Sequence, residues 1–177
     1  MEARPKMEVP LTPADRVANL AAWVALGLLW ALTVWYLIQL PATIPVHFNG
    51  AGEPDRYGEK GSLAVLSLMA TALFAALTAI TNAVGKHPHT LNYPVRITPA
   101  NALGQYRGAI RLARSLRIGV VLVFLQQLYQ TAQVAAGQAQ GLGAWSLPVD
   151  LGLVLVLPGL WYWRTVVAAT PPPAPAP

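Results

Sequence analysis

The chain of 177 residues contains no cysteine, so disulfide bonds, thiolate metal ligands and cysteine nucleophiles are all excluded. Charge is also scarce. Lys, Arg, Asp and Glu make up 11% of the residues, against roughly a quarter in an average soluble domain. Hydrophobic residues, in contrast, make up 55%. This composition argues against a soluble domain, and the length suits one compact domain.

Three long segments carry no charged side chain at all. They lie between Arg16 and Glu53, between Lys60 and Lys86, and between Arg117 and Asp150. A bilayer excludes charge from its hydrocarbon core, and a helix needs about 20 apolar residues to cross it. The sequence therefore predicts an all-α integral membrane protein with one membrane domain over 17–167. We predict a cytoplasmic arm over 1–16 before it and a disordered Pro/Ala tail over 168–177 after it.

Four transmembrane helices are predicted in this domain, over 17–40, 62–84, 116–136 and 147–167. The first has a clear start, because Thr12-Pro13-Ala14-Asp15 combines a capping hydroxyl, a proline at the first helical position and an acid three residues after the cap. The fourth is short, since only 13 residues separate Asp150 from Arg164, and a re-entrant segment is the alternative. The cluster Trp161-Tyr162-Trp163 favours a full crossing, and Pro158-Gly159 predicts a kink.

The segment before the third span carries a regular series of arginines. Thr98-Pro99 is a second signal for the start of a helix. Beyond it the pattern is amphipathic. One face is apolar and consists of Leu103, Tyr106, Ile110 and Ala113. The other is basic and consists of Arg107, Arg111 and Arg114. We therefore predict a basic interfacial helix that leads into the third span and contacts anionic lipid headgroups.

Lys and Arg are unequally divided between the two sides of the predicted membrane domain. If both termini are cytoplasmic, ten of the twelve lie on the cytoplasmic side, and only Arg56 and Lys60 lie outside. Cytoplasmic loops of membrane proteins carry such an excess. The sequence therefore predicts cytoplasmic termini and an external loop between the first two spans, here called loop one (Leu40–Lys60).

Loop one holds the most distinctive chemistry in the chain. Pro41 and Pro45 predict an extended backbone after the first helix. Gly50 and Gly52 allow the chain to turn sharply. Several polar side chains then come close together on the outer face, namely His47, Asn49, Glu53, Asp55 and Glu59.

The order of residues in loop one follows a recognisable pattern, Leu-Pro, then Ile-Pro-x-His-Phe-Asn-x-x-Gly-x-x-Asp, then Lys. Its members here are Leu40, Pro41, Ile44, Pro45, His47, Phe48, Asn49, Gly52, Asp55 and Lys60. The pattern resembles a bacterial membrane domain of unknown function, which also forms the N-terminal part of the SdpI-like immunity proteins. A second similar stretch consists of Asn92, Tyr93, Pro94, Val95, Thr98, Asn101, Gln105 and Tyr106. The resemblance covers about residues 20 to 125, without the further motif of the longer immunity proteins.

The SdpI-like proteins protect a cell from a secreted toxic peptide. The resemblance therefore implies a location in the bacterial cytoplasmic membrane and a secreted peptide as a possible ligand. It also implies that loop one contacts the ligand, or is organised to do so, through His47, Asn49, Gly52, Asp55 and Lys60.

A metal site is one alternative use of loop one. His47, Glu53, Asp55 and Glu59 supply nitrogen and oxygen ligands that suit zinc or manganese. Their spacing matches no established metal motif. We therefore favour hydrogen bonds from His47 and Asn49 to the loop backbone, with Asp55 capping a turn. No cofactor is predicted.

Polar residues within the predicted spans are further candidates. Asp150 lies near the start of the fourth span, where an acid is either functional or stabilised by the helix dipole and headgroup water. Gln126 and Gln130 share one face of the third span with Gln127 beside them, and Asn82 ends a polar row on the second. Such rows hold helices together more often than they line a transport path.

No hydrolase, metalloprotease, phosphate-binding or dinucleotide-binding motif occurs in the sequence, so we do not expect an enzyme. The net charge of +5 is explained by basic residues beside the spans, and no nucleic acid partner is expected. Our first hypothesis is an SdpI-like protein for peptide immunity or envelope sensing, which acts by binding. The second is a structural accessory subunit of a larger membrane complex. The third is a metal-binding protein or metal-dependent enzyme built on loop one.

Overall fold

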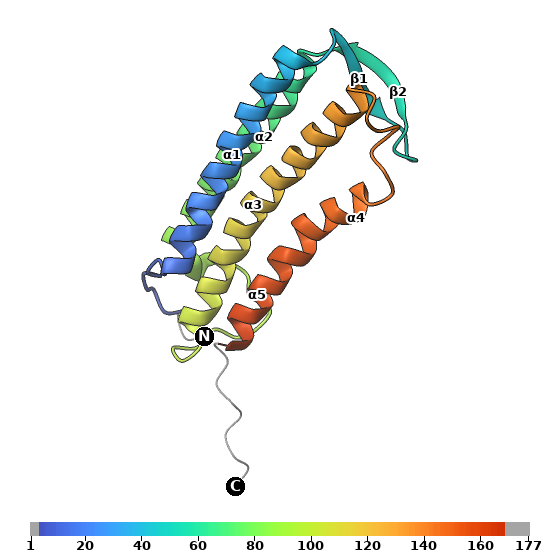
Figure 1. Cartoon of the computed structure of the whole chain (residues 1–177). Helices are drawn as coiled ribbons and strands as arrows, with labels where there is room; N and C mark the ends of the chain where they lie inside the picture. Colours follow the sequence, from blue (N-terminus) through green and yellow to red (C-terminus); the bar gives the residue numbers. More distant parts are fainter. Residues whose placement is uncertain (1–3, 169–177) are drawn as a thin grey trace.

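The computed structural model describes residues 4–168, so the predicted tail falls outside the described residues. In this part of the chain the long helices pack side by side as the rods of one bundle (Figure 1). They are α1 (Pro13–Gln39), α2 (Ser62–Lys86), α3 (Ala102–Ala135) and a composite rod of α4 (Ser146–Leu151), the π-helical turn η2 (Gly152–Val156) and α5 (Leu157–Ala168). The short 3-10 helix η1 (Pro88–Thr90) lies between α2 and α3.

The prediction of an all-α fold is wrong in loop one, which forms a two-stranded antiparallel hairpin of β1 (Thr43–Phe48) and β2 (Pro54–Glu59). The physical reason is local, because Pro41 and Pro45 hold the backbone extended and the glycines between the strands permit the reversal. The hairpin lies at one end of the bundle with the α3–α4 loop, and this end is called the hairpin end (Figure 1). The opposite end, where α1 and α3 begin, is called the arginine end.

Three helices in the described residues are long and apolar enough to cross a membrane, namely Pro13–Gln39, Ser62–Lys86 and Ser146–Val166. Only 28%, 22% and 11% of their most apolar windows is buried, so most of this apolar surface faces outward. Such a surface would be a liability in water, whereas lipid tails cover it without cost. The structure therefore supports a membrane protein.

Helix α3 is the polar member of the bundle and packs against α1, α2 and α5. It contains 34 residues. At 1.5 Å per residue such a helix is about 51 Å long, enough to cross a bilayer, although its arginines and glutamines set it apart from the three apolar helices.

The predicted basic helix leads into the third span, because residues 102–135 form one uninterrupted helix, which begins three residues after Pro99. The prediction that its arginines contact lipid headgroups does not fit Arg114 and Arg117, which are each only 4% exposed. A guanidinium group inside the bundle must find acceptors and negative charge there, since an unpaired buried charge is strongly destabilising.

Asp15, in the first turn of α1, supplies that negative charge. Its Oδ1 accepts hydrogen bonds from Arg111 Nε at 3.0 Å and from Arg114 Nη1 at 2.7 Å. Its Oδ2 accepts the backbone N–H of Thr12 at 2.9 Å, and Thr12 Oγ1 accepts the backbone N–H of Asp15 at 3.3 Å. The predicted capping box is confirmed, and its acid also joins α1 to α3.

Asn19, one turn further along α1, continues this network into the bundle. Its Oδ1 accepts from Arg114 Nε at 3.0 Å and from Arg117 Nη2 at 2.7 Å. Arg117 Nη1 in turn donates to Thr78 Oγ1 on α2 at 3.1 Å. The first three helices are therefore connected at the arginine end by hydrogen bonds to two buried guanidinium groups.

The composite rod matches the bounds of the predicted fourth span, 147–167, to within one residue at each end. The helix continues past Pro158, which has no N–H to donate and whose ring would clash with the carbonyl four residues earlier. The π-helical turn η2 lies directly before it and absorbs this misfit. Close packing on α3 also requires Gly119, where a Cβ would lie 2.3 Å from the carbonyl oxygen of Leu153.

An apolar core between α1, α2 and α3 includes Leu29, Phe74 and Leu128. The polar row on α2 faces the neighbouring helices, as Ser67 Oγ lies 2.6 Å from Thr33 Oγ1. The prediction that these rows join helices is therefore supported. Asn82 is the exception, because it is exposed.

We predict that Asp15→Asn destabilises the protein strongly, because two guanidinium groups would lose their shared counter-charge. Breaking a buried ion pair by removing one partner costs about 3–5 kcal/mol. Thermal unfolding of the detergent-purified protein measures the effect, and Glu8→Gln, which changes an exposed acid at the same end, serves as the control. Equal unfolding temperatures for the two variants would contradict the role given to Asp15.

Candidate functional site

The turn of the hairpin is organised by Asn49. Its Oδ1 accepts the backbone N–H groups of Ala51 at 2.9 Å and Glu53 at 3.0 Å, and its Nδ2 donates to Glu53 Oε2 at 3.1 Å. Gly52 has a φ of +79°, which favours glycine. Asn49 therefore bonds to the loop backbone as predicted, and it fixes the shape of the turn.

His47 and Asp55 pair across the two strands instead of bonding to the backbone. His47 Nδ1 lies 2.6 Å from Asp55 Oδ1, with the two side chains 53% and 44% exposed. The prediction that Asp55 caps a turn is therefore wrong, because Asp55 lies at the strand irregularity between the pairs His47–Arg56 and Phe48–Pro54 and contacts His47 from there. An exposed pair of this kind contributes little to stability. Lys60 has a structural contact, as its Nζ donates to the carbonyl of Leu40 at 3.0 Å.

The turn of the hairpin docks on the loop between α3 and α4. The backbone N–H of Leu142 donates to the carbonyl of Gly52 at 2.8 Å. Gly141 permits this approach, since a Cβ there would lie 2.3 Å from the same carbonyl oxygen. The two segments are distant in sequence, and together they close the hairpin end of the bundle (Figure 1).

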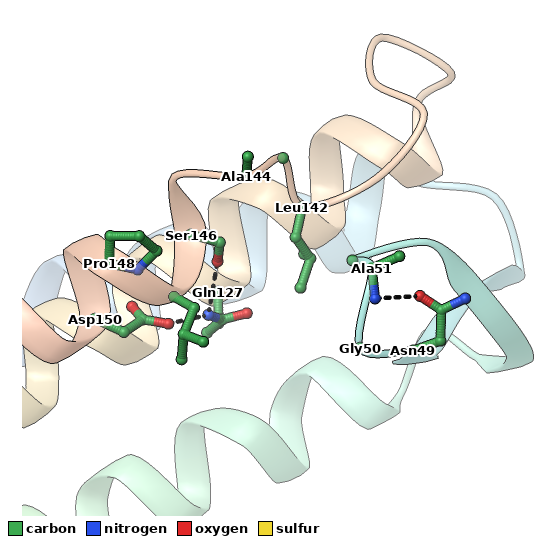
Figure 2. A pocket seen from close by; sticks show the side chains of 12 residues that line it. Asn49, Gly50, Ala51, Gln127, Leu142, Ala144, Ser146, Pro148 and Asp150 are labelled. Atoms are coloured by element: carbon green, nitrogen blue, oxygen red, sulfur yellow. Dashed lines mark hydrogen bonds between the residues drawn. The ribbon is translucent and has the colours of Figure 1, made fainter.

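A cavity of about 530 Å³ lies beneath this contact. Its walls come from the hairpin turn, the α3–α4 loop, α4 and Gln127 of α3 (Figure 2). The polar side chains in the wall are those of Asn49, Gln127, Ser146 and Asp150. The volume is within the range of small-molecule sites, and mixed apolar and polar walls are typical of them.

Asp150 and Gln127 point toward one another at one side of this cavity (Figure 2). Gln127 Nε2 donates to Asp150 Oδ2 at 2.6 Å and contacts Ser146 Oγ at 3.4 Å. Ser146 Oγ donates to Gln130 Oε1 at 2.9 Å, and Gln126 Nε2 donates to the carbonyl of Ser146 at 3.2 Å. Three predicted polar residues, Asp150, Gln126 and Gln130, are thus brought together around the start of α4.

One atom of this group is not satisfied. Asp150 Oδ1 is closed to solvent and has no hydrogen-bond partner among the described residues. A carboxylate can accept about four hydrogen bonds, so the single bond from Gln127 leaves most of its capacity unused. Buried polar groups are normally paired, and an exception calls for an explanation.

A second cavity, of about 330 Å³, lies beside the first and shares Gln127 and Leu142 with it. His47 and Phe48 of β1 and Thr131 of α3 also contribute to its walls. The motif residues of the hairpin therefore border both cavities, on either side of Leu142.

The second motif stretch lies at the arginine end. Tyr93 and Tyr106 are in contact, with ring centroids 5.5 Å apart and ring planes tilted by 43°, and Tyr93 Oη donates to the carbonyl of Pro88 at 2.8 Å. Burial raises the pKa of Tyr93 to about 12.

The other members of this stretch lie in the segment before α3 and in its first turns. Asn101 Oδ1 accepts the backbone N–H of Thr98 at 2.8 Å, and Gln105 is buried at 2% exposure. Asn92 borders a small cavity of about 260 Å³ beside Tyr93, and Pro94 directly follows Tyr93. The two parts of the sequence pattern therefore lie at opposite ends of the bundle and do not form one site.

The weak metal hypothesis gains no support from the hairpin geometry. His47 bonds to Asp55, Glu53 bonds to Asn49, and Glu59 lies at the hairpin base opposite Thr43. Among residues 4–168 no group of three or more His, Cys, Asp and Glu side chains is arranged to hold a metal ion.

Comparison with known proteins finds a match to one family model over part of the chain and a similar protein. Residues 24–71 match the model of a domain of unknown function, DUF1648, which covers the hairpin and the adjoining halves of α1 and α2. An uncharacterized protein of Archaeoglobus fulgidus is 32% identical over 89 residues, which is 48% of this chain and 49% of that protein. The chain thus spans about half the length of this relative. No solved structure matches.

Sequence reasoning missed the α3–α4 loop as part of the site. Leu142 and Gly141 carry no chemical signature, and only the fold shows that they meet Gly52. Ser146 was missed as well, although a serine four residues before Asp150, one helical turn away, was a signal for a shared polar position.

We predict that Gly141→Ala separates the α3–α4 loop from the hairpin, because the new methyl group would overlap the carbonyl of Gly52. Hydrogen exchange should become faster at the Leu142 amide and at the hairpin turn. Gly61→Ala is the matched control, since its methyl group enters open space. Unchanged exchange in Gly141→Ala would show that the contact does not hold the two segments together.

Proposed function

We propose that the chain is a four-span membrane protein that binds a ligand at its hairpin end, on the outer side of the membrane, and acts by binding rather than by catalysis. The observation that carries this proposal is the cavity between the hairpin, the α3–α4 loop and α4. Its most distinctive wall residue, Asp150, offers an acceptor that the protein itself leaves unused.

The orientation rests on charge. Ten of the twelve Lys and Arg residues belong to the segments at the arginine end, whereas Arg56 and Lys60 belong to the hairpin. The positive-inside rule then places the arginine end in the cytoplasm and the hairpin outside. In this orientation α3 is the third crossing, shielded from lipid on part of its surface by α1, α2 and α5. The even number of crossings leaves both termini cytoplasmic, in a bacterial-type cytoplasmic membrane.

The resemblance to SdpI-like proteins suggests what kind of ligand is involved. Loop one carries the pattern of that family, and in the structure it forms one wall of the cavity through Asn49 and Gly52. A secreted membrane-active peptide, or a part of it, is therefore the ligand class we favour. The biological role would be protection from such a peptide or the sensing of it at the envelope.

Expression in a susceptible bacterium tests this function. Purified membrane-active bacterial peptides are added one by one, and the minimal inhibitory concentration is measured with and without the chain. We expect an increase for at least one peptide, lost in Gly141→Ala and kept in Gly61→Ala at equal membrane levels. No increase for any peptide would contradict the immunity role.

An accessory subunit is the competing function, and the outward apolar faces of α1, α2 and α5 would suit it. Purification from the native membrane in mild detergent distinguishes the ligand-binding function from the subunit function. We expect no protein to co-purify at a fixed ratio. A stoichiometric partner would replace the proposal with the subunit role.

A further inference from the structure

We propose that the cavity at the hairpin end receives an ammonium group, which binds at the carboxylate of Asp150. This inference rests on the proposed function, because it names the chemical class that the same cavity selects. The ligand would be a small primary amine, or a peptide that presents its amino terminus or a lysine side chain.

The charge of the cavity wall is the first argument. Of the described residues that form the wall, Asp150 is the sole charged one, and none is basic. The ion pairs of the described residues lie elsewhere, at the arginine end and across the hairpin. The carboxylate therefore has no counter-ion within the described residues, and the cavity favours a cation over a neutral or anionic group.

The hydrogen bonding of Asp150 is the second argument. Gln127 donates the single hydrogen bond that the described residues give this carboxylate, at Oδ2, so an ionised carboxylate in the cavity wall keeps most of its four acceptor positions unused. Leaving an ionised group unsatisfied in such a place is costly, so a donor that completes its shell would bind favourably. The arrangement also fixes the side chain, because Gln127 holds Asp150 against the cavity before any ligand arrives.

The choice of an ammonium group over a metal ion follows from the ligand count. A divalent cation requires six or more oxygen ligands for calcium, or a near-octahedral set for magnesium. The cavity offers a single carboxylate, with no second acid in its wall. An ammonium group needs only a few acceptors and carries three donors, so one carboxylate with neighbouring polar groups suffices.

The size and position of the cavity set the limits of the ligand. A volume of about 530 Å³ holds one amino acid side chain with its backbone, but not a folded domain. Gln127 lies eight residues before the end of α3, so the carboxylate is about 12 Å inside the hairpin end of that helix. A ligand must therefore insert an extended end into the protein past the hairpin turn.

Two probes that differ in one charge test the inference with the detergent-purified full chain. Leucinamide carries a free ammonium group at pH 6.5, because α-amino groups titrate near pH 8, whereas N-acetylleucinamide carries none. We expect leucinamide to bind at least about tenfold more tightly, the minimum for one hydrogen bond between charged groups. The dissociation constants of both probes are measured from the increase in unfolding temperature with probe concentration.

Asp150→Asn should remove the preference for leucinamide, and Glu59→Gln, which neutralises an exposed acid of the hairpin, should keep it. If Asp150→Asn does not fold, the ratio of the two dissociation constants in the unaltered protein still tests the ammonium site. Equal constants, or no binding of either probe, would overturn the ammonium site. Peptide protection in the bacterial assay would then still stand, so the two failures are distinguishable.

Discussion

The carboxylate of Asp15 is the contact on which the arrangement of the helices depends most. Helix α3 carries guanidinium groups into a bundle whose other helices are apolar, and Arg114 and Arg117 are buried there away from water. Asp15 pairs with two of them, and Asn19 accepts hydrogen bonds from Arg114 and Arg117. Because both acceptors lie on α1, the first helix is fixed in one register along α3. The bundle is therefore built around a polar helix.

At the hairpin end the polar side chains of α3 are also paired with groups on other elements, with one exception. The glutamines of α3 find partners at the start of α4, and Gly119 lets the π-helical turn approach α3 closely. The hairpin turn closes this end through its bond to Leu142. Only the second oxygen of Asp150 is left without a partner among these polar groups. Three other buried atoms also lack a partner among the described residues, namely Gln105 Oε1, Arg107 Nε and Arg117 Nε, but of the four residues Asp150 alone lines the cavity at the hairpin end.

Much of the fold follows from the sequence, because charge-free runs and helix caps are local signals. The capping box at Thr12 and the bounds of the apolar helices were predictable for this reason. The hairpin was not, since its proline and glycine signals fix an extended chain and a turn but not the pairing of strands. The arginines of α3 were also misread. Their spacing of three and four residues describes a helical face, and that pattern is the same whether the face meets water or a buried acid such as Asp15. Likewise, Asp150 and Gln127 were visible as polar residues, but their meeting depends on how α4 packs.

The measurement that tests the account most directly is the sidedness of the two ends, and the absence of cysteine makes it simple. Single cysteines at the exposed positions Ala51, His87 and Gln138 can be labelled in intact cells with a membrane-impermeant maleimide. We predict that Ala51→Cys and Gln138→Cys are labelled from outside, whereas His87→Cys reacts only after the membrane is permeabilised. Labelling of His87→Cys in intact cells, or protection of either hairpin-end position, would contradict a four-span protein with an external binding site.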